Sequence, residues 1–499
     1  MMARLLSQRP YNNMRAHQTI YGVVPTVTTF LRAGLVCIAS VGAASAATAG
    51  QPPPLELAHG GAAPAHLAIF GSANPAAPSL NPNRLRVGVL SNLSGGYEIG
   101  DADDFDREVN RVTDDFNDLE FRINRLRFSE TMPEPAEIRS LVEDVIDFEN
   151  DANALVSDLT DAAYGKFTGS VTGPGAPLSL RSNVLEGVVT LDYAAYVEAR
   201  VALESSGDAF NTGLRDLDPS QIDEPTQVEV VGQPNGIPVL IIDGEEYGFR
   251  ASEDAGLAVQ GGIVRRLSGG YSQAVGRSDE GALHAGVTAH IYRVTLARSG
   301  ILLDDSADTL NVAEDEFDDN QTTTGGVGLD AGLVWVTDSY SIGGTLKNIN
   351  APSFDYPDPC ASGNTESCAF FKANPQARRN GNSWSMERQV TLEGSAFTAD
   401  RRWIASARLD LNSVADATGD DTQWAAISGA YVPVHFWIPS PRVGYRRNLT
   451  GEGLSFINAG LTFFRALRLD GSMALESSSL NGTNLPRSAQ ANLGLDLQF

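Results

Sequence analysis

The chain has 499 residues and a net charge of −26, with 62 acidic side chains against 36 basic ones. An excess of negative charge on this scale repels phosphates and argues against a nucleic-acid partner. Outside the N-terminus no run of eighteen apolar residues predicts a membrane-spanning helix. The length fits either two or three soluble domains or one large barrel with appendages.

Residues 1–46 predict an export signal. An apolar segment follows Arg32 and closes on the small residues Ala44–Ala46, which suit signal peptidase. Cys37 is preceded by Val36, whereas lipoprotein processing needs a small residue there. We therefore expect a protein that is cleaved near Ala46 and exported without a lipid anchor. The alternative is an amphipathic or buried helix, for which the Gly and Ser content is poor.

Two cysteines remain after the signal is removed. Cys360 and Cys368 flank a short segment rich in Ser, Gly and Asn, and an even pair in an exported protein predicts a disulfide. The neighbouring sequence has no His for a zinc site, and the spacing is not that of a redox dithiol.

Residues 47–84 read as a Pro/Gly/Ala-rich linker and as a candidate N-terminal plug, and a strand is expected to begin at Leu85. Residues 101–163 predict a helical hairpin inserted after it. Two apolar stripes with helical spacing are joined by a short proline turn and should pack antiparallel; they are Phe105, Val109, Val112, Phe116, Leu119, Ile123, Leu126 and Ile138, Leu141, Val145, Phe148, Ala152, Leu155, Leu159. The acidic residues off the stripes are either solvated or part of a partner surface.

From residue 189 onward the apolar period becomes two. Polar and charged side chains occupy the alternate positions, so each strand needs a wet face opposite its apolar one. His284, His290, Arg408 and Asp410 are the candidates for this inner face. The two histidines are six residues apart on one strand, about 20 Å, which is too far to share a metal ion.

The last eleven residues, 489–499, alternate in the same way and end on an aromatic residue. A strand with no residue after it leaves an open edge that must pair with an earlier strand, here the one near Leu85. Leu495, Leu497 and Phe499 are predicted to form the barrel-assembly signal. The alternative is an edge strand of a soluble antiparallel sandwich.

The links between strands favour the barrel. Counted back from the C-terminus, long polar links alternate with tight turns, as in outer-membrane barrels with short periplasmic turns and long outer loops. Eleven strands from about residue 255 and three earlier ones predict an antiparallel transmembrane β-barrel of about 14 strands over 85–499. The parity places the helical hairpin outside the cell. Residues 204–254 hold either an extra hairpin or a loop ornament.

The chain also resembles a known family, the conjugal-transfer TraF-like outer-membrane proteins, which are distant relatives of FadL-type transporters of hydrophobic compounds. The residues that carry the resemblance are Asp330–Asp338, Gly343–Asn350, Ser353–Pro357, the earlier Asn74-Pro75-Ala76 and the acidic helical insert from Asp101. The match runs from about residue 68 to 499. It implies an outer-membrane barrel of roughly FadL size and says little about activity.

No catalytic, cofactor-binding or metal-binding pattern is present in the sequence, so we expect a non-enzyme. The acidic segment 304–319 is either a surface site for divalent cations or merely solvated. The leading hypothesis is a porin-like or FadL-like barrel that passes or binds small or apolar molecules. The second is a cell-surface interaction protein in conjugative transfer. Expected partners are outer-membrane lipid, the barrel-assembly machinery and, for the second hypothesis, conjugation components.

Overall fold

The structure is a computed structural model that describes Leu57, residues 74–81, 84–101, 135–205 except 163, 256–302, 320–480 except 362 and 364, and 483–498, with short pieces between 111 and 125 and between 210 and 251. The predicted signal peptide (1–46), the acidic segment 304–319 and the terminal Phe499 lie outside the described residues.

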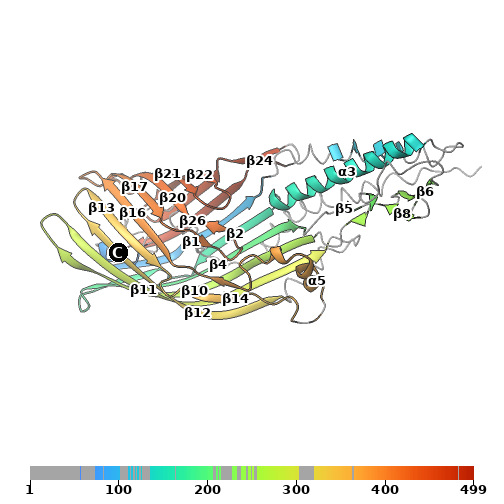
Figure 1. Cartoon of the computed structure of the whole chain (residues 1–499). Helices are drawn as coiled ribbons and strands as arrows, with labels where there is room; N and C mark the ends of the chain where they lie inside the picture. The colour runs from blue at the N-terminus through green and yellow to red at the C-terminus, as the bar shows by residue number, and fades with distance from the viewer. Residues whose placement is uncertain are drawn as a thin grey trace, which may run out of the picture.

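One antiparallel sheet wraps round to form a barrel (Figure 1). Fifteen strands belong to it, and β2 shares one position with β3 (Leu178–Ser182), because both lie between β1 and β4. The other strands around the barrel are β1 (Leu85–Ile99), β2 (Tyr164–Thr172), β4 (Gly187–Glu204), β10 (Gly256–Arg277), β11 (Ala282–Leu302), β12 (Gln321–Val336), β13 (Tyr340–Lys347), β16 (Gln389–Phe397), β17 (Trp403–Asp410), β20 (Trp424–Tyr431), β21 (Ser440–Asn448), β22 (Ser455–Phe463), β23 (Leu467–Ala474) and β26 (Ser488–Gln498). The prediction of about 14 strands is confirmed.

The first and last strands close the wall. β26 pairs antiparallel with β1 from Arg86↔Gln498 to Glu98↔Ser488, and on its other edge with β23. The C-terminal strand therefore has no open edge, as its alternating sequence predicted. The soluble sandwich is excluded, because the described sheet is closed on itself.

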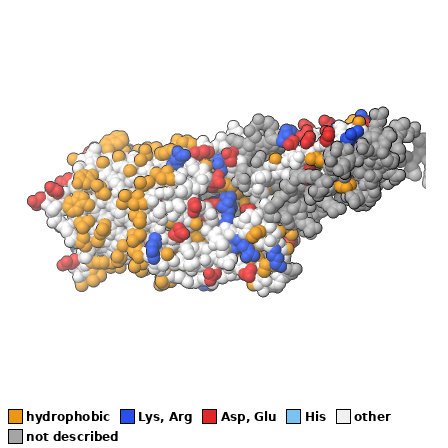
Figure 2. All heavy atoms as spheres, in the orientation of Figure 1, with side chains coloured by type: hydrophobic (Ala, Val, Ile, Leu, Met, Phe, Trp, Pro, Cys, Tyr) orange, Lys and Arg blue, Asp and Glu red, His pale blue; other side chains and the backbone are white. Residues whose placement is uncertain are grey.

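The outer surface of the barrel is apolar. Along β17 exposed and buried residues alternate strictly, and the exposed positions of neighbouring strands include Ile427, Val443 and Ile457. Figure 2 shows such side chains gathered over the end of the barrel away from the helices. A closed barrel with apolar residues outside and polar residues inside satisfies its backbone in hydrocarbon. The fold is an all-β membrane barrel.

The two ends of the barrel differ as the loop lengths predicted, with one exception. Tight turns join β10 to β11, β12 to β13 and β16 to β17, and the longer links emerge at the opposite end. The exception is the turn at 432–439, which is longer than the opposing loop at 449–454. This turn exposes Phe436 and Trp437, so it extends the aromatic residues that barrels place at a membrane interface.

The predicted helical hairpin lies at the loop end. Its second helix is α3 (Pro135–Ala162), and the described helical residues Val112 and Leu119 pack against it in a core of their own. Three ion pairs run antiparallel along the hairpin: Arg111–Asp151, Arg122–Asp144 and Arg125–Glu137. No helix among the described residues is long and apolar enough to span a membrane.

Beyond the end of β4, the described pieces of the region 204–254 form a loop ornament and add no strand to the barrel. The ornament contains a separate three-stranded sheet of β6 (Val228–Gly232), β7 (Pro238–Ile242) and β8 (Glu245–Gly248). The remaining short elements are η3 (Ala77–Leu80), β5 (Phe210–Asn211), β9 (Arg250–Ala251), β14 (Ser353–Asp355), α5 (Glu366–Ala373), η6 (Pro375–Ala377), β15 (Ser383–Ser385), β18 (Val414–Ala415), β19 (Asp421–Thr422), β24 (Ser477–Leu480) and β25 (Thr483–Pro486).

A charge on the outer face should destabilise the barrel in a depth-dependent way. Ile427 is 60% exposed in the middle of β20, and Ile427→Arg should cost about 2–4 kcal/mol in unfolding from lipid vesicles. Val434→Arg, in a turn, should cost at most about 1 kcal/mol. Equal costs at the two positions, measured by urea unfolding, would contradict the lipid-facing assignment.

Candidate functional site

The inner face of the wall is polar, and the four side chains predicted to line it are buried there. His284 and His290 lie on β11, and Arg408 and Asp410 lie on β17. Arg408 Nη2 is 3.1 Å from Asp410 Oδ1. The structure therefore brings Arg408 and Asp410 together as an ion pair of the inner wall.

The two histidines have separate partners. The ring nitrogens of His290 lie 2.9 Å from Ser268 Oγ and 3.0 Å from Asp330 Oδ2, whereas His284 Nδ1 lies 2.7 Å from Ser79 Oγ. Within the described ranges no three His, Cys, Asp or Glu side chains are placed to hold a metal ion. The histidines act as hydrogen-bonding groups of the wall and its contents.

A short N-terminal segment, residues 74–81, lies against the inner wall. The side-chain oxygen of Asn74 accepts a hydrogen bond from the Ala76 amide at 2.9 Å, which forms a tight local turn before η3. Its side-chain nitrogen donates to the carbonyl oxygens of Leu333 and Gly344, both at 3.3 Å, and to Glu393 Oε1 at 2.6 Å. One side chain thus binds three neighbouring strands.

Two glycines of the wall make room for this segment. A Cβ atom on Gly286 would lie 2.0 Å from the carbonyl oxygen of Pro75, and one on Gly332 would lie 2.1 Å from Asn74 Oδ1. Any larger residue at either position would displace the segment.

The other end of the segment is attached as well. Besides the contact of Ser79 with His284, Arg181 of β3 donates to the carbonyl oxygens of Ser79 (3.0 Å) and Asn81. Residues 74–81 are therefore hydrogen-bonded to the inner wall at both of their ends.

The loop end of the interior is occupied by a second inward segment, residues 414–422, which contains β18 and β19. Its Asp420 carboxylate contacts Lys166 Nζ (3.0 Å), Arg200 Nη1 (3.0 Å) and Arg379 Nη1 (2.6 Å). Lys166 also pairs with Asp416. Because Lys166 and Arg200 come from β2 and β4, these ion pairs tie the segment to the wall.

Charge strengthens this attachment. Burial alone would raise the pKa of Asp420, but Lys166, Arg200 and Arg379 together lower it well below its ordinary value. The carboxylate is therefore charged at neutral pH and remains so into the acid range.

An aromatic cluster packs the long link between β13 and β16 inside the same end. Phe354 of β14 packs against both Tyr292 of β11 and Trp384 of β15. Trp384 Nε1 donates to the carbonyl oxygen of Ala415 at 3.0 Å. The two inward links therefore support one another as well as the wall.

Cys360 and Cys368 form a disulfide within this link, at the start of α5. The helix packs on β11 where a wall glycine leaves space, since a Cβ atom on Gly300 would lie 2.0 Å from the Phe370 ring. Ser367 Oγ accepts from the Gly300 amide at 3.0 Å.

The wall is interrupted between β2 and β3. The β1–β2 pairing ends at Leu93↔Val171, and the β1–β3 pairing begins at Val87↔Leu178. Residues 173–177 stand opposite only Asp192 and Tyr193 of β4. They therefore bulge out of the ladder, with Ala176 N bonded to Gly173 O and Gly88 N bonded to Pro177 O. The described wall has a local break here, next to exposed Val89, Leu191 and Tyr193.

The sequence alone did not identify Glu393, Lys166 or Asp420 as residues of the inner site. Each is a lone charged residue of a strand or loop, and its partners lie far away in the chain. Asn74 was noted only as part of Asn74-Pro75-Ala76, one of the segments that carry the family resemblance. A signal for the break was present in Gly173-Pro-Gly-Ala-Pro177, because prolines cannot donate to a sheet ladder.

A closed barrel with an apolar exterior and a polar inner face defines the class: an integral membrane β-barrel of the outer-membrane type. Residues 72–410 match the family described as "F plasmid transfer operon, TraF, protein". This match covers more than half of the chain, so the protein belongs to that family, which confirms the resemblance. No curated protein matches the chain.

Several solved structures are similar in fold. A TodX deltaS2S3 mutant monoaromatic hydrocarbon channel is 10% identical, with 86% of this chain and 94% of that chain covered and a TM-score of 0.39. A Pseudomonas aeruginosa FadL homologue is 13% identical (91% and 99% covered, TM-score 0.37). The Ralstonia pickettii toluene transporter TbuX is 11% identical (89% and 98% covered, TM-score 0.37). At identities and TM-scores this low, the substrates of those proteins are not assigned to this chain.

Removing the charge of Asp420 should loosen the inward segment. When folding lowers the pKa of a carboxyl group, its charge stabilises the native state fully at pH values above its ordinary pKa of about 3.9. That contribution is lost as the pH falls from the ordinary pKa through the lower pKa of the folded state. Asp420→Asn should therefore speed hydrogen–deuterium exchange of residues 414–422 at pH 7. Wild-type protection, corrected for intrinsic rates, should hold down to about pH 4.

The control for this experiment is Asp421→Asn, because Asp421 is the exposed neighbour. It should leave exchange unchanged. Equal effects of the two substitutions would show that the ion pairs of Asp420 do not hold the segment.

Proposed function

We propose that this barrel passes or binds small apolar molecules in the outer membrane, with residues 74–81 as an internal plug. Export with cleavage near Ala46, and recognition of Leu495, Leu497 and Phe499 by the barrel-assembly machinery, belong to the same proposal. Leu495 and Leu497 lie on β26 next to β1, at the end of the chain that the machinery would read.

The wall break carries the proposal. Passage along a polar lumen from one end to the other is not favourable for an apolar molecule. Such a molecule partitions into the hydrocarbon of the bilayer instead. The break in strand pairing at 173–177 lies beside a lipid-facing surface that bears Val89, Leu178 and Leu191, and in this proposal it is the side exit from the interior. A molecule that enters the barrel could therefore leave sideways into hydrocarbon without crossing the plugged end.

Two of the proteins with similar solved structures are a monoaromatic hydrocarbon channel and a toluene transporter. They suggest which compounds to try first as probes for this chain.

Closing the break should abolish passage. Deleting Pro174–Ala176 leaves Gly173 and Pro177 opposite Asp192 and Tyr193 of β4, so the residue count on the β4 side of the ladder matches. Uptake of a radiolabelled monoaromatic hydrocarbon by cells that express this variant should fall to the level of cells without the protein. The variant should still show the heat-modifiable migration of a folded barrel.

The matched control lacks Asp304–Ser306, three residues of the long acidic link, and should keep its uptake. Undiminished uptake in the variant with the closed wall would refute exit through the break.

The helical hairpin favours a second function, partner contact during conjugative transfer. It has its own apolar core with Leu214 and Tyr247, and its ion pairs lie on the outside. A barrel needs none of this to stay closed, so the hairpin is built as a unit that can present a surface.

Deleting residues 105–159 should then lower mating frequency or partner capture by the intact cell, while barrel assembly and hydrocarbon uptake stay unchanged. A transfer frequency equal to that of the wild type would remove this second function.

A further inference from the structure

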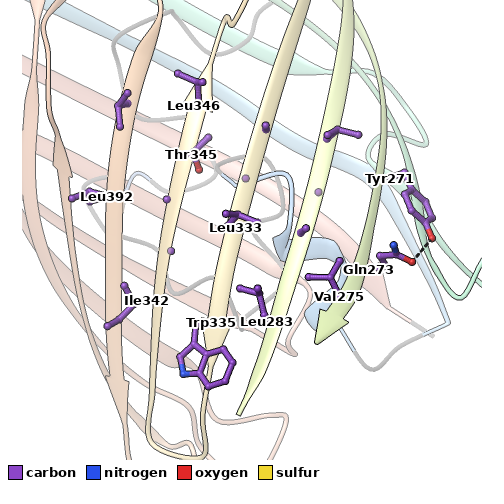
Figure 3. A pocket seen from close by; sticks show the side chains of 18 residues that line it. Tyr271, Gln273, Val275, Leu283, Leu333, Trp335, Ile342, Thr345, Leu346 and Leu392 are labelled. Carbon is purple, nitrogen blue, oxygen red and sulfur yellow. Dashed lines mark hydrogen bonds between the residues drawn. The ribbon is translucent and has the colours of Figure 1, made fainter. Parts of the chain in front are cut away.

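An apolar groove of about 800 Å³ runs along the outer wall over β10 to β13 and β16 (Figure 3). One end is formed by Trp335 and Val275, beside the tight turns, and the other by Leu346 and its cross-strand neighbour Val390. Its polar groups are few, chiefly Gln273 and the hydroxyl of Tyr271, which bond to one another at 2.9 Å. The volume is in the range of pockets that hold small ligands.

Small outward side chains create the groove. Cross-strand pairing places Ala285 beside Leu333, Leu333 beside Gly344, and Ala331 beside Leu346. Small and large residues therefore alternate across three strands. The small ones form the floor, and the exposed side chains of Leu333, Ile342 and Leu392 rise around it.

The floor is held from behind. Asn74 binds the carbonyl oxygens of Leu333 and Gly344 from inside the barrel, and Pro75 fills the space beside Gly286. The wall cannot move inward to flatten the groove, so the groove is preformed and its occupant does not have to open it.

The surroundings identify the occupant. The rim residues Leu333, Ile342 and Leu392 are exposed on the apolar outer face of the barrel, which faces the bilayer. An unfilled apolar groove would forfeit packing contacts along its whole length. Aromatic side chains such as Trp335, one residue before the end of β12, mark the height of lipid head groups in membrane barrels.

We propose that this groove binds one acyl chain of a membrane phospholipid, with the head group at the Trp335 end and the chain extended toward Leu346. The groove is thus a lipid site on the outer wall, separate from any passage through the interior.

The test uses wild-type protein in vesicles of phosphatidylethanolamine and phosphatidylglycerol, doped with a phospholipid that carries a diazirine in its acyl chain. After photolysis, mass spectrometry should find adducts on Ala331, Leu333 and Leu346 severalfold above those on Ile427 and Ile457, which face lipid elsewhere on the barrel. Uniform labelling of all these positions would overturn the proposal.

Two variants sharpen the test. Ala331→Phe fills the floor and should abolish the enrichment, whereas Ala405→Phe, at an exposed position on β17, should leave it intact. Both variants should migrate as folded barrels. Enrichment that survives Ala331→Phe, or groove positions that are protected from lipid because a second copy of the chain covers them in native mass spectrometry, would also overturn it.

Discussion

The structure depends on one constraint: in hydrocarbon, backbone amides and carbonyls must find their partners within the protein. The pairing of β1 with β26 meets it by removing the last free edge. The constraint also explains why the break at 173–177 is short. Its backbone bonds to itself and to its neighbours, through Ala176 N to Gly173 O and Gly173 N to Tyr193 O. A larger opening would leave polar groups facing lipid.

Closure creates a second problem, which is a polar interior that must be filled or hydrated. Two segments far apart in the chain enter it and bond to its wall. Asn74 holds the N-terminal segment by bonds to backbone carbonyls and to Glu393, whereas Asp420 holds residues 414–422 by charge. The attachment therefore differs in kind: neutral hydrogen-bonding side chains and backbone carbonyls hold residues 74–81 together with Glu393 and His284, whereas ion pairs between full charges hold residues 414–422.

Much of the fold could be predicted because apolar and polar residues alternate along each strand, and this alternation shows which face of the strand points outward. Alternation in the last strand predicted closure, and the order of long and short links predicted a barrel. β3 was not recognised as a strand, since five residues after a Pro/Gly turn give too short a pattern. The sequence did not decide the structure of the region 204–254, because its apolar runs suit a wall strand or a surface sheet equally well.

The contents of the barrel could not be predicted in the same way. Asn74 meets its partners across 259 to 319 residues of sequence, and such contacts follow from strand register, which a single sequence does not specify. The groove arises in the same manner, because Ala285, Ala331 and Gly344 become neighbours only after β11, β12 and β13 are aligned.

Closure of the wall by the C-terminal strand is the central claim, and a cysteine pair tests it directly. Leu93 of β1 stands opposite Leu493 of β26, and the native Cys360 and Cys368 are already paired with one another. In isolated membranes the Leu93→Cys, Leu493→Cys variant should form an internal disulfide on mild oxidation, because directly opposed strand positions lie within disulfide reach. The Leu93→Cys, Leu497→Cys variant should not. Failure of the first pair to cross-link in folded, membrane-inserted protein would contradict a barrel closed by β1 and β26.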